Sequence, residues 1–280
     1  MSELVVNLHV TERCNYSCTF CFGKWDGAAS DAEVFRTQGR AVIQAVFDAV
    51  SGQFPGVRFT FAGGEPGLLP SLPDLMTFCR SLGARVSFVS NGLVLRRLGV
   101  AWVRANVDMV GISVDSALTD TNRRIGRATR DGSVLDLAFL ADSFRKLAGG
   151  PTLKVNTVVS ADNWQEDLSP TITALAPHVW KIFQTLPVYG EQGTITPEQF
   201  HAFLARHAAL AGLMVPEDNE EMTGSYLMVD PLGRFFWRDP SAATGYRYSA
   251  PILQAGAAAA FAEAVVSWPK YDRRYAHRPR

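Results

Sequence analysis

The sequence predicts an α/β fold in which parallel strands alternate with helices and curve toward a barrel, followed by a C-terminal extension. Strand-like and helix-like hydrophobic patterns alternate over roughly the first two thirds of the 280 residues, as they do in successive βα units. Three of the four cysteines lie within eight positions after the first strand, at the end where a βα barrel has its reactive groups. Beyond Pro187 the alternation stops, which marks the extension.

The barrel elements follow from two hydrophobic periods. Val34, Val42, Ile43, Val46 and Phe47 recur at helical spacing and place the first helix at 33–50, and the other elements are assigned by the helical period or by strand-like runs between turn residues. The strands are expected at 4–10, 57–62, 85–90, 109–114, 153–159 and 180–186, and the helices between them at 33–50, 71–82, 93–105, 136–147 and 170–175.

The extension has a different order of elements. Thr196 and Pro197 begin a helix. An Asp-Pro-Leu-Gly turn joins two short strands, and an alanine-rich run forms the last helix. We expect the helix at 197–213, the hairpin strands at 226–229 and 234–237, the last helix at 254–266 and a weakly ordered basic end at 270–280. The chain therefore divides into a barrel core, 1–187, and an extension, 188–280, that covers the active site.

The charge balance excludes several classes of partner. Lys and Arg total 27, as do Asp and Glu, so the formal net charge is zero, and no overall positive field is available to hold nucleic acid or an anionic membrane. A polyanionic ligand would need a local cluster of basic residues. No apolar run reaches the roughly 18 residues of a membrane span, and Met1-Ser2-Glu3 leads directly into the first strand, so we expect a soluble cytoplasmic protein.

The clustered cysteines indicate metal chemistry. Cys14, Cys18 and Cys21 have the spacing C-x3-C-x2-C, and three thiolates on one loop can hold three corners of a [4Fe-4S] cluster and leave the fourth iron open. The alternative is a structural zinc site completed by a distant histidine, although the second paired-ligand motif of such sites is missing. Cys79 lies on the apolar face of the 71–82 helix and is expected to be buried in the core.

The cysteine spacing, with an aromatic residue before the last cysteine, resembles the radical S-adenosylmethionine superfamily. A Gly-Gly-Glu-Pro loop follows the second strand, and polar residues follow the third and fourth strands, in the order found in that superfamily. The resemblance implies that the open iron binds S-adenosylmethionine, that the glycine loop contacts its amino group, and that an arginine pairs with its carboxylate. The expected cofactor-binding residues are Gly63, Gly64, Glu65, Ser90, Asn91, Ser113 and Arg127.

A closer resemblance, over almost the whole chain, is to prokaryotic members of the viperin family. The segments that carry it are 7–22 (NLHVTERCNYSCTFCF), 86–93, 114–127, 154–156, 180–184 and 215–230 (VPEDNEEMTGSYLMVD). The resemblance implies a partial (β/α)6 barrel of the radical S-adenosylmethionine type with a C-terminal extension. It also implies an antiviral enzyme that dehydrates a ribonucleoside triphosphate to its 3′-deoxy-3′,4′-didehydro chain-terminating analogue. CTP is the best-known substrate of the family, and UTP and GTP are the alternatives. The electrons would come from a reductant such as flavodoxin or ferredoxin.

The same resemblance assigns the substrate site. Three basic residues on expected strands are predicted to bind the triphosphate, two asparagines to bind ribose or phosphate, and a tyrosine to deliver the final hydrogen atom or proton. A cation inside a barrel also needs an anionic partner on physical grounds. The substrate-binding residues are expected to be Asn7, Arg58, Lys154, Asn156 and Lys181, and the catalytic residues Tyr226 and Lys154.

Departures from the family pattern leave part of the site open. Val179 stands where viperins have an arginine, so one phosphate-binding cation is missing or comes from elsewhere, with His178 and Arg238 as possible substitutes. Ala62 replaces a serine before the glycine loop. A second alternative to the nucleotide dehydratase is a non-enzymatic binding protein stabilised by zinc or a cluster. The main alternative is a radical enzyme that acts on a peptide or another small molecule. That alternative predicts further cysteines for auxiliary clusters, and none follows Cys79.

Overall fold

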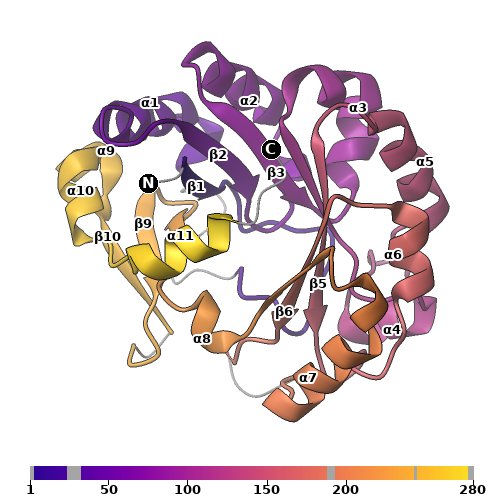
Figure 1. The fold of residues 1–280 in the computed structure, drawn as a ribbon. Helices are drawn as coiled ribbons and strands as arrows, with labels where there is room; N and C mark the ends of the chain where they lie inside the picture. Colours follow the sequence, from indigo (N-terminus) through magenta and orange to yellow (C-terminus); the bar gives the residue numbers. More distant parts are fainter. Residues whose placement is uncertain (1–2, 24–32, 188–192, 243–244, 277–280) are drawn as a thin grey trace.

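One curved ten-stranded sheet forms the centre of the protein, in the order β10-β9-β8-β1-β2-β3-β4-β5-β6-β7. The computed structural model describes residues 3–23, 33–187, 193–242 and 245–276. The six strands β1 to β6 are parallel and adjacent in chain order, which confirms the predicted partial barrel (Figure 1). The strands are β1 Leu4–His9, β2 Val57–Ala62, β3 Arg85–Ser90, β4 Met109–Ser113, β5 Thr152–Val159, β6 Val179–Gln184, β7 Met214–Glu217, β8 Leu227–Val229, β9 Arg234–Arg238 and β10 Tyr246–Pro251.

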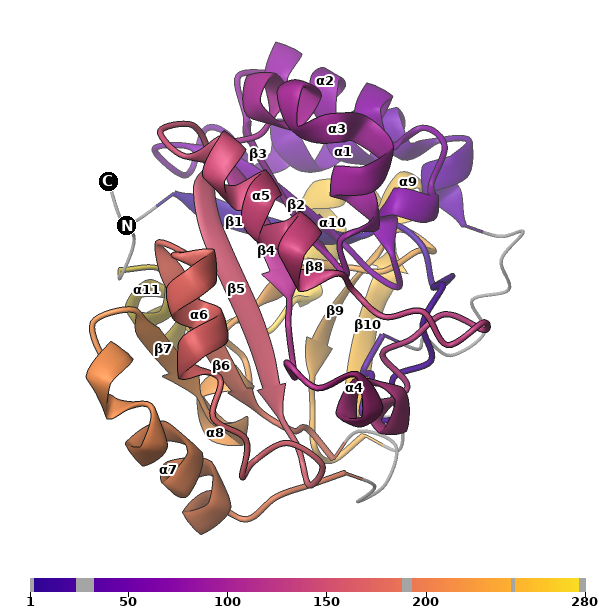
Figure 2. The same ribbon diagram turned by 90° about the vertical axis from the view of Figure 1, so that its right-hand side faces the viewer.

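Helices cover the outer face of this sheet, as successive βα units require. Figures 1 and 2 show α1, α2, α3, α5 and α6 around the outside of the strands. The α-helices are α1 Gly39–Val50, α2 Leu72–Ser81, α3 Leu93–Asn106, α4 Thr119–Ile125, α5 Leu137–Leu147, α6 Ser169–Leu175, α7 Pro197–Arg206, α8 Asn219–Met222, α9 Ile252–Ala255, α10 Ala257–Glu263 and α11 Trp268–Ala276. Short 3-10 helices lie at Val34–Arg36, Pro66–Leu68 and Ala208–Leu210.

The core lies between the sheet and these helices. In α1 the residues that predicted it, Val42, Ile43 and Val46, are fully buried, and so is Cys79 in α2. The core position of Cys79 is therefore confirmed. The predicted first helix is correct except at its start, where a separate 3-10 turn, Val34–Arg36, precedes α1.

The second half adds strands to both edges of the barrel sheet. The predicted hairpin is confirmed as β8 and β9, with the Asp230 carboxylate accepting hydrogen bonds from the amides of Leu232 and Arg234 in the turn. Strand β8 also pairs in parallel with β1. The helix expected through residue 213 is wrong beyond Arg206, because His207 is buried and accepts a hydrogen bond from the amide of Leu168. The residues after that break form β7, which pairs with β6.

The basic end was predicted to be weakly ordered, and within the described residues this is wrong. Residues Trp268–Ala276 form helix α11, while 277–280 lie outside the described residues. Tyr271 is buried, and its hydroxyl bonds to the amide of Val5 and the carbonyl of Glu3. Helix α11 therefore lies against the amino end of β1 (Figures 1 and 2).

The alanine-rich helix expected at 254–266 is also divided. It forms α9 and α10, separated by Gly256, whose φ of 85° interrupts the helix.

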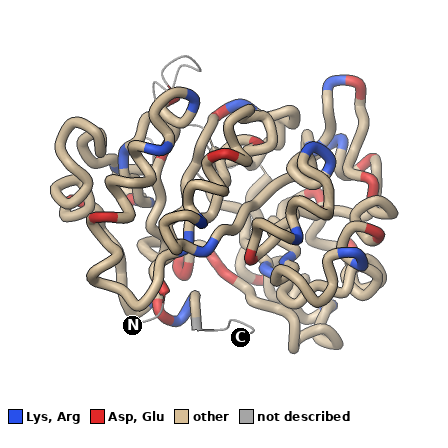
Figure 3. Tube along the Cα trace, turned by 90° about the horizontal axis from the view of Figure 1, so that it is seen from above, with Lys and Arg blue, Asp and Glu red and all other residues tan. Residues whose placement is uncertain are grey.

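Acidic and basic residues are interleaved around the outside of the molecule, in agreement with the zero net charge (Figure 3). Within the part of the chain that the structure describes, none of the helices has the length and apolar character needed to cross a membrane.

Candidate active site

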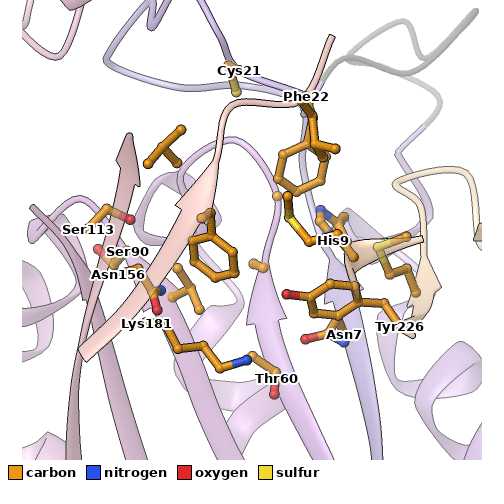
Figure 4. Close-up of a pocket in the computed structure, with 18 of the residues that line it drawn as sticks. Asn7, His9, Cys21, Phe22, Thr60, Ser90, Ser113, Asn156, Lys181 and Tyr226 are labelled. Carbon is orange, nitrogen blue, oxygen red and sulfur yellow. The ribbon is translucent and has the colours of Figure 1, made fainter. Parts of the chain in front are cut away.

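One cavity runs through the inside of the barrel, from the cysteine loop to a group of cations near the amino ends of the strands. In Figure 4, Cys21 lies at one end, Lys181 and Thr60 lie at the other, and the hydroxyl of Tyr226 points inward from one wall. The lining side chains follow the two-residue period of each strand. Examples are Asn7 and His9 on β1, Arg58 and Thr60 on β2, Lys154 and Asn156 on β5, and Lys181 and Phe183 on β6.

The cysteine loop is held by the end of helix α4. The amide of Ser17 donates to the carbonyl of Gly126 at 3.0 Å, and the amide of Thr19 donates to the carbonyl of Ile125 at 2.8 Å. Gly126 has a φ of 82°, and a Cβ there would lie 2.4 Å from the Ser17 oxygen. Only glycine permits this approach. Helix α4 was not predicted, although it fixes the loop that carries the cysteines.

Cys14, Cys18 and Cys21 all line the cavity and are free thiols. Burial raises the pKa of Cys14 to about 11 and also raises the pKa of Cys18, so both thiols must lose a proton on binding iron. Among the described residues, no group of three His, Cys, Asp or Glu side chains converges on the position of a single metal ion. All three thiols border the same cavity, and an iron–sulfur cluster, unlike a single metal ion, binds its cysteines at separate iron atoms.

Gly63 and Gly64 allow the loop after β2 to pack against the chain that enters the cysteine loop. The amide of Gly64 donates to the carbonyl of Thr11 at 2.7 Å. A Cβ at Gly64 would lie 2.3 Å from the oxygen of Arg13, and a Cβ at Gly63 would lie 2.5 Å from that of Thr11. Both glycines line the cavity, but the close approach that requires them is to the protein backbone.

Glu65 does not line the cavity, although it was predicted to contact the cofactor. Its carboxylate accepts hydrogen bonds from the amide of Gly67 at 2.9 Å, the hydroxyl of Ser90 at 2.9 Å and the amide of Asn91 at 2.8 Å. Burial raises the pKa of Glu65 to about 7 against the effect of these bonds. The Asn91 side chain in turn donates to Asn15 Oδ1 at 2.8 Å. Glu65 thus orders the loop that presents Ser90 and Asn91 to the cysteine loop.

Arg127 lies at the cavity wall with Cys18 and Ser113. Its Nε forms an ion pair with Asp115, a fully buried carboxylate that also accepts the amide of Val158 at 2.8 Å. Burial raises the pKa of Asp115 despite the neighbouring guanidinium. The predicted contact of Arg127 with a cofactor carboxylate stays a prediction, and its partner in this structure is Asp115.

Four cations gather at the opposite end of the cavity: Arg58, Lys154, Lys181 and Arg274. Lys154 forms no ion pair with any described residue, and burial, followed by the charges of Lys181 and Arg58, holds its pKa well below the usual value. Gly111 on β4 leaves room for this side chain, since a Cβ there would lie 3.1 Å from Lys154 Cε. This end of the cavity therefore holds more basic side chains than the described acids pair with, since Lys181 and Arg274 share Glu217 and Lys154 has no ion pair.

Arg274 was not predicted as a site residue. It comes from α11, is 8% exposed, and places its Nη1 2.6 Å from Glu217 Oε2. Of the two substitutes considered for the cation absent at Val179, Arg238 lines the cavity. His178 is wrong as a substitute, because its Nδ1 accepts the amide of Leu153 and its side chain lies outside the cavity.

Glu217, at the end of β7, connects the cations to Tyr226. Its Oε1 forms an ion pair with Lys181 Nζ, and its Oε2 accepts the Tyr226 hydroxyl at 2.8 Å. The guanidinium carbon of Arg274 lies 3.4 Å from the centroid of the Tyr226 ring. Burial alone would raise the pKa of Glu217, but Lys181 and Arg274 outweigh it and lower that pKa. No sequence signal singled out this acid.

Amides and aromatic rings line the middle of the cavity. Asn7 donates from Nδ2 to the carbonyl of Leu227 at 3.2 Å, while the Oδ1 of Asn156 is buried without a hydrogen-bond partner in the described part of the chain. His9 packs edge-on against Phe22 and Phe236, and burial lowers its pKa to about 3. His9 is therefore a neutral ring in this wall.

The structure thus brings nearly all the predicted site residues to one cavity, with Glu65 behind its wall. The predicted residues that line it are Asn7, Cys14, Cys18, Cys21, Arg58, Gly63, Gly64, Ser90, Asn91, Ser113, Arg127, Lys154, Asn156, Lys181 and Tyr226.

Comparison with known proteins identifies the family. The Radical SAM superfamily model matches residues 8–142. An S-adenosylmethionine-dependent nucleotide dehydratase of Pseudoalteromonas ulvae is 34% identical, covering 98% of this chain and 94% of the relative. One of Psychrobacter lutiphocae is 37% identical, covering 98% and 95%. The chain belongs to the family of S-adenosylmethionine-dependent nucleotide dehydratases. This viperin-like family also includes a relative named RSAD2 from Oncorhynchus mykiss, 34% identical over 82% of this chain and 68% of that protein.

Solved structures support the fold of this nucleotide dehydratase family member. The structure of anSMEcpe with bound S-adenosylmethionine aligns with a TM-score of 0.62 at 18% identity, over 86% of this chain and 75% of that one. Streptococcus suis SuiB bound to S-adenosylmethionine aligns with a TM-score of 0.59 at 12% identity, over 84% and 60%. At these identities the likeness shows the barrel fold alone.

The nucleotide dehydratase family uses a [4Fe-4S] cluster and S-adenosylmethionine, and the residues present fit both. Three free thiols border the cavity at the carboxyl end of β1, and Gly63, Ser90 and Ser113 border the same cavity. Thiolates are the donors that iron–sulfur clusters require. The polar loops lie where S-adenosylmethionine bound at a cluster would need hydrogen-bonding groups.

Proposed function

We propose that this enzyme dehydrates a ribonucleoside triphosphate to its 3′-deoxy-3′,4′-didehydro analogue. The observation that carries the proposal is the group of four cations below the cysteine loop, among which Lys154 has no ion-pair partner in the described residues. A buried cation without a partner is costly unless an anion joins it. A triphosphate supplies several negative charges at once, and its nucleoside then extends toward the cysteines.

The chain's own residues would orient the two reactants. Arg58, Lys154 and Lys181 would bind the triphosphate, and Arg274 would supply the charge absent at Val179. Forked guanidinium groups and a lysine point charge are the common protein ligands of phosphate. Because these cations lie at the amino ends of the strands, they would hold the ribose between the phosphates and the cofactor.

The middle of the cavity would position the ribose. The unpartnered Asn156 Oδ1 is an acceptor for a ribose hydroxyl, and Asn7 lies opposite it on β1. When bound, the cluster and S-adenosylmethionine would supply the radical chemistry that begins the dehydration at the ribose.

Tyr226 would hold the proton or hydrogen atom needed to complete the reaction. Its hydroxyl lies inside the cavity and donates to Glu217, and burial raises its pKa well above the usual value, so the phenol stays protonated at neutral pH. The rings of Phe22, Phe236 and Tyr246 belong to the apolar cluster against which Tyr226 packs, and an apolar wall would help to protect a reactive intermediate.

The test is an anaerobic assay of the reconstituted enzyme with CTP, UTP, GTP and ATP in parallel, followed by mass spectrometry of the products. We expect a dehydrated nucleotide and 5′-deoxyadenosine whose release is stimulated by a triphosphate and little by the mono- or diphosphate. Equal stimulation by all three phosphorylation states would remove the triphosphate role of the cation group. Failure to cleave S-adenosylmethionine at all would remove the radical chemistry.

The finer points of the proposal rest on family membership. We infer CTP as the preferred substrate, a flavodoxin or ferredoxin as reductant, and a chain-terminating product that acts against phage in the cytoplasm. Base preference would be decided by the parallel assay. The defence role would be decided by plating phage on cells that carry the wild-type enzyme or the Cys18→Ala variant.

A further inference from the structure

Glu217 is a buried acid with three partners that belong to two parts of the site. Lys181 and Arg274 are members of the cation group, and Tyr226 belongs to the reacting part of the cavity. Glu217 itself is 4% exposed and does not line the cavity. A ligand in the cavity would therefore meet Glu217 through these three side chains.

The two oxygens of this carboxylate have separate tasks. Oε1 faces Lys181, whereas Oε2 accepts the Tyr226 hydroxyl at 2.8 Å and lies 2.6 Å from Arg274 Nη1. Tyr226 and Arg274 thus share one oxygen, and the guanidinium also lies over the Tyr226 ring. A change in the charge around Arg274 therefore alters the hydrogen bond of the Tyr226 hydroxyl through the shared Oε2 atom.

We propose that Glu217 is a positioning residue that couples the anion-binding end of the site to Tyr226. It holds Lys181 and Arg274 in place before substrate arrives, and it fixes the position of the tyrosine hydroxyl at the cavity wall. This inference rests on the proposed dehydration of a triphosphate. Glu217 touches neither the cofactor nor the reacting atoms, so its effect passes through Lys181 and Tyr226.

The charges around Lys181 make this role measurable. The groups that face it are Glu217 from β7, Arg274 from α11, Arg58 from β2 and Lys154 from β5. Burial lowers the pKa of Lys181 to about 8, and Glu217 is the group that opposes this fall. Without Glu217, Lys181 would be surrounded by cations alone and would lose its proton at a lower pH.

The first experiment measures binding of inorganic tripolyphosphate to the reconstituted enzyme with S-adenosylmethionine, by calorimetry between pH 6 and pH 9. For the wild type, affinity should fall as pH rises through about 8. For Glu217→Gln the fall in affinity should begin at least one pH unit lower than in the wild type. At pH 6 the affinities of variant and wild type should lie within about threefold of each other. Glu198→Gln, at an exposed acid on α7 outside the cavity, is the matched control and should follow the wild-type profile. Glu217→Asp should restore part of that profile.

The second experiment measures how many molecules of 5′-deoxyadenosine are released for each dehydrated nucleotide formed. This ratio should rise in Tyr226→Phe, which lacks the hydroxyl. It should also rise in Glu217→Gln, in which the carboxylate no longer holds the Tyr226 hydroxyl in place. The double variant should show the ratio of Tyr226→Phe alone, because both changes act at one hydroxyl. A purely structural role of Glu217 would instead give additive losses.

The outcomes separate the two proposals. If the wild type neither binds tripolyphosphate nor forms a dehydrated nucleotide, the proposed function fails, and the role of Glu217 fails with it. If the wild type does both while Glu217→Gln keeps the wild-type pH profile or the wild-type ratio, only the role of Glu217 is overturned. Thermal melts of each variant identify any loss that comes from unfolding, and Glu217→Asp then replaces Glu217→Gln in both experiments.

Discussion

Replacing Lys154 with Met should make the protein more stable and less active. Lys154 lies inside the cavity without an ion-pair partner in the described residues, and Met has a similar length without the charge. An unpartnered buried cation costs several kcal/mol in a dry interior, but this cavity admits water. We therefore expect a gain of about 1–2 kcal/mol in the free energy of unfolding, or roughly 2–6 °C in Tm.

The pH dependence gives this prediction a sign. Burial, with the charges of Lys181 and Arg58, holds the pKa of Lys154 well below its usual value of 10.5. At pH values between the lowered pKa of the folded protein and the usual pKa of 10.5, Lys154 is protonated in the unfolded chain but not in the folded one. The free energy of unfolding of the wild type therefore rises with pH in this range. The advantage of Lys154→Met should therefore shrink as pH approaches 10.

Activity should change in the opposite direction. A hydrogen bond to a charged group contributes about 1.5–3 kcal/mol, so losing one phosphate contact should lower kcat/KM for the triphosphate by roughly 10- to 150-fold. The assays are thermal melts without substrate and product formation under anaerobic conditions. Lys146→Met is the control, because that lysine is 60% exposed and paired with Asp142. A lower Tm or an unchanged kcat/KM in Lys154→Met would refute the reasoning.

Three further predictions address the cluster, the glycine loop and the cation group. Cys18→Ala should abolish bound iron and turnover with little change in the melting of the cluster-free protein, whereas Cys79→Ala, in the core, should lose stability and keep its iron. Gly64→Ala should lower the free energy of unfolding by about 2–4 kcal/mol and weaken iron retention. The reason is that the new Cβ would lie 2.3 Å from the Arg13 carbonyl oxygen, and unchanged melting would contradict it. The Lys181→Arg variant should keep its affinity for a triphosphate above pH 8. The wild type should lose affinity there, because Lys181, with its pKa of about 8, loses its charge. Parallel pH profiles of variant and wild type would exclude Lys181 as the titrating group.

The strand positions of the site could be predicted from the sequence because a strand has a fixed period of two. Once β5 is assigned, Lys154 and Asn156 must share a face, and the same holds for Lys181 and Phe183 on β6. The alternation of elements then brings those faces to one barrel interior. The cysteine spacing identifies the reactive end, because three thiols on one loop have few other uses.

The parts that were missed depend on contacts between distant segments. Arg274 and Glu217 meet only because α11 lies against the amino end of β1 and β7 extends the sheet. Neither element has a strong local signal. Strand β7 has only four residues, and α11 is a basic segment near the chain end. Helix α11 is stabilised by the burial of Tyr271 rather than by helix propensity.

Arg274 also changes what the zero net charge means. The missing arginine at Val179 suggested a weaker phosphate site, but a cation from a different element reaches the same cavity. This cation comes from helix α11 and forms an ion pair with Glu217. The positive charge of this neutral protein is therefore concentrated where a triphosphate would bind, and one buried acid links it to the tyrosine that would complete the reaction.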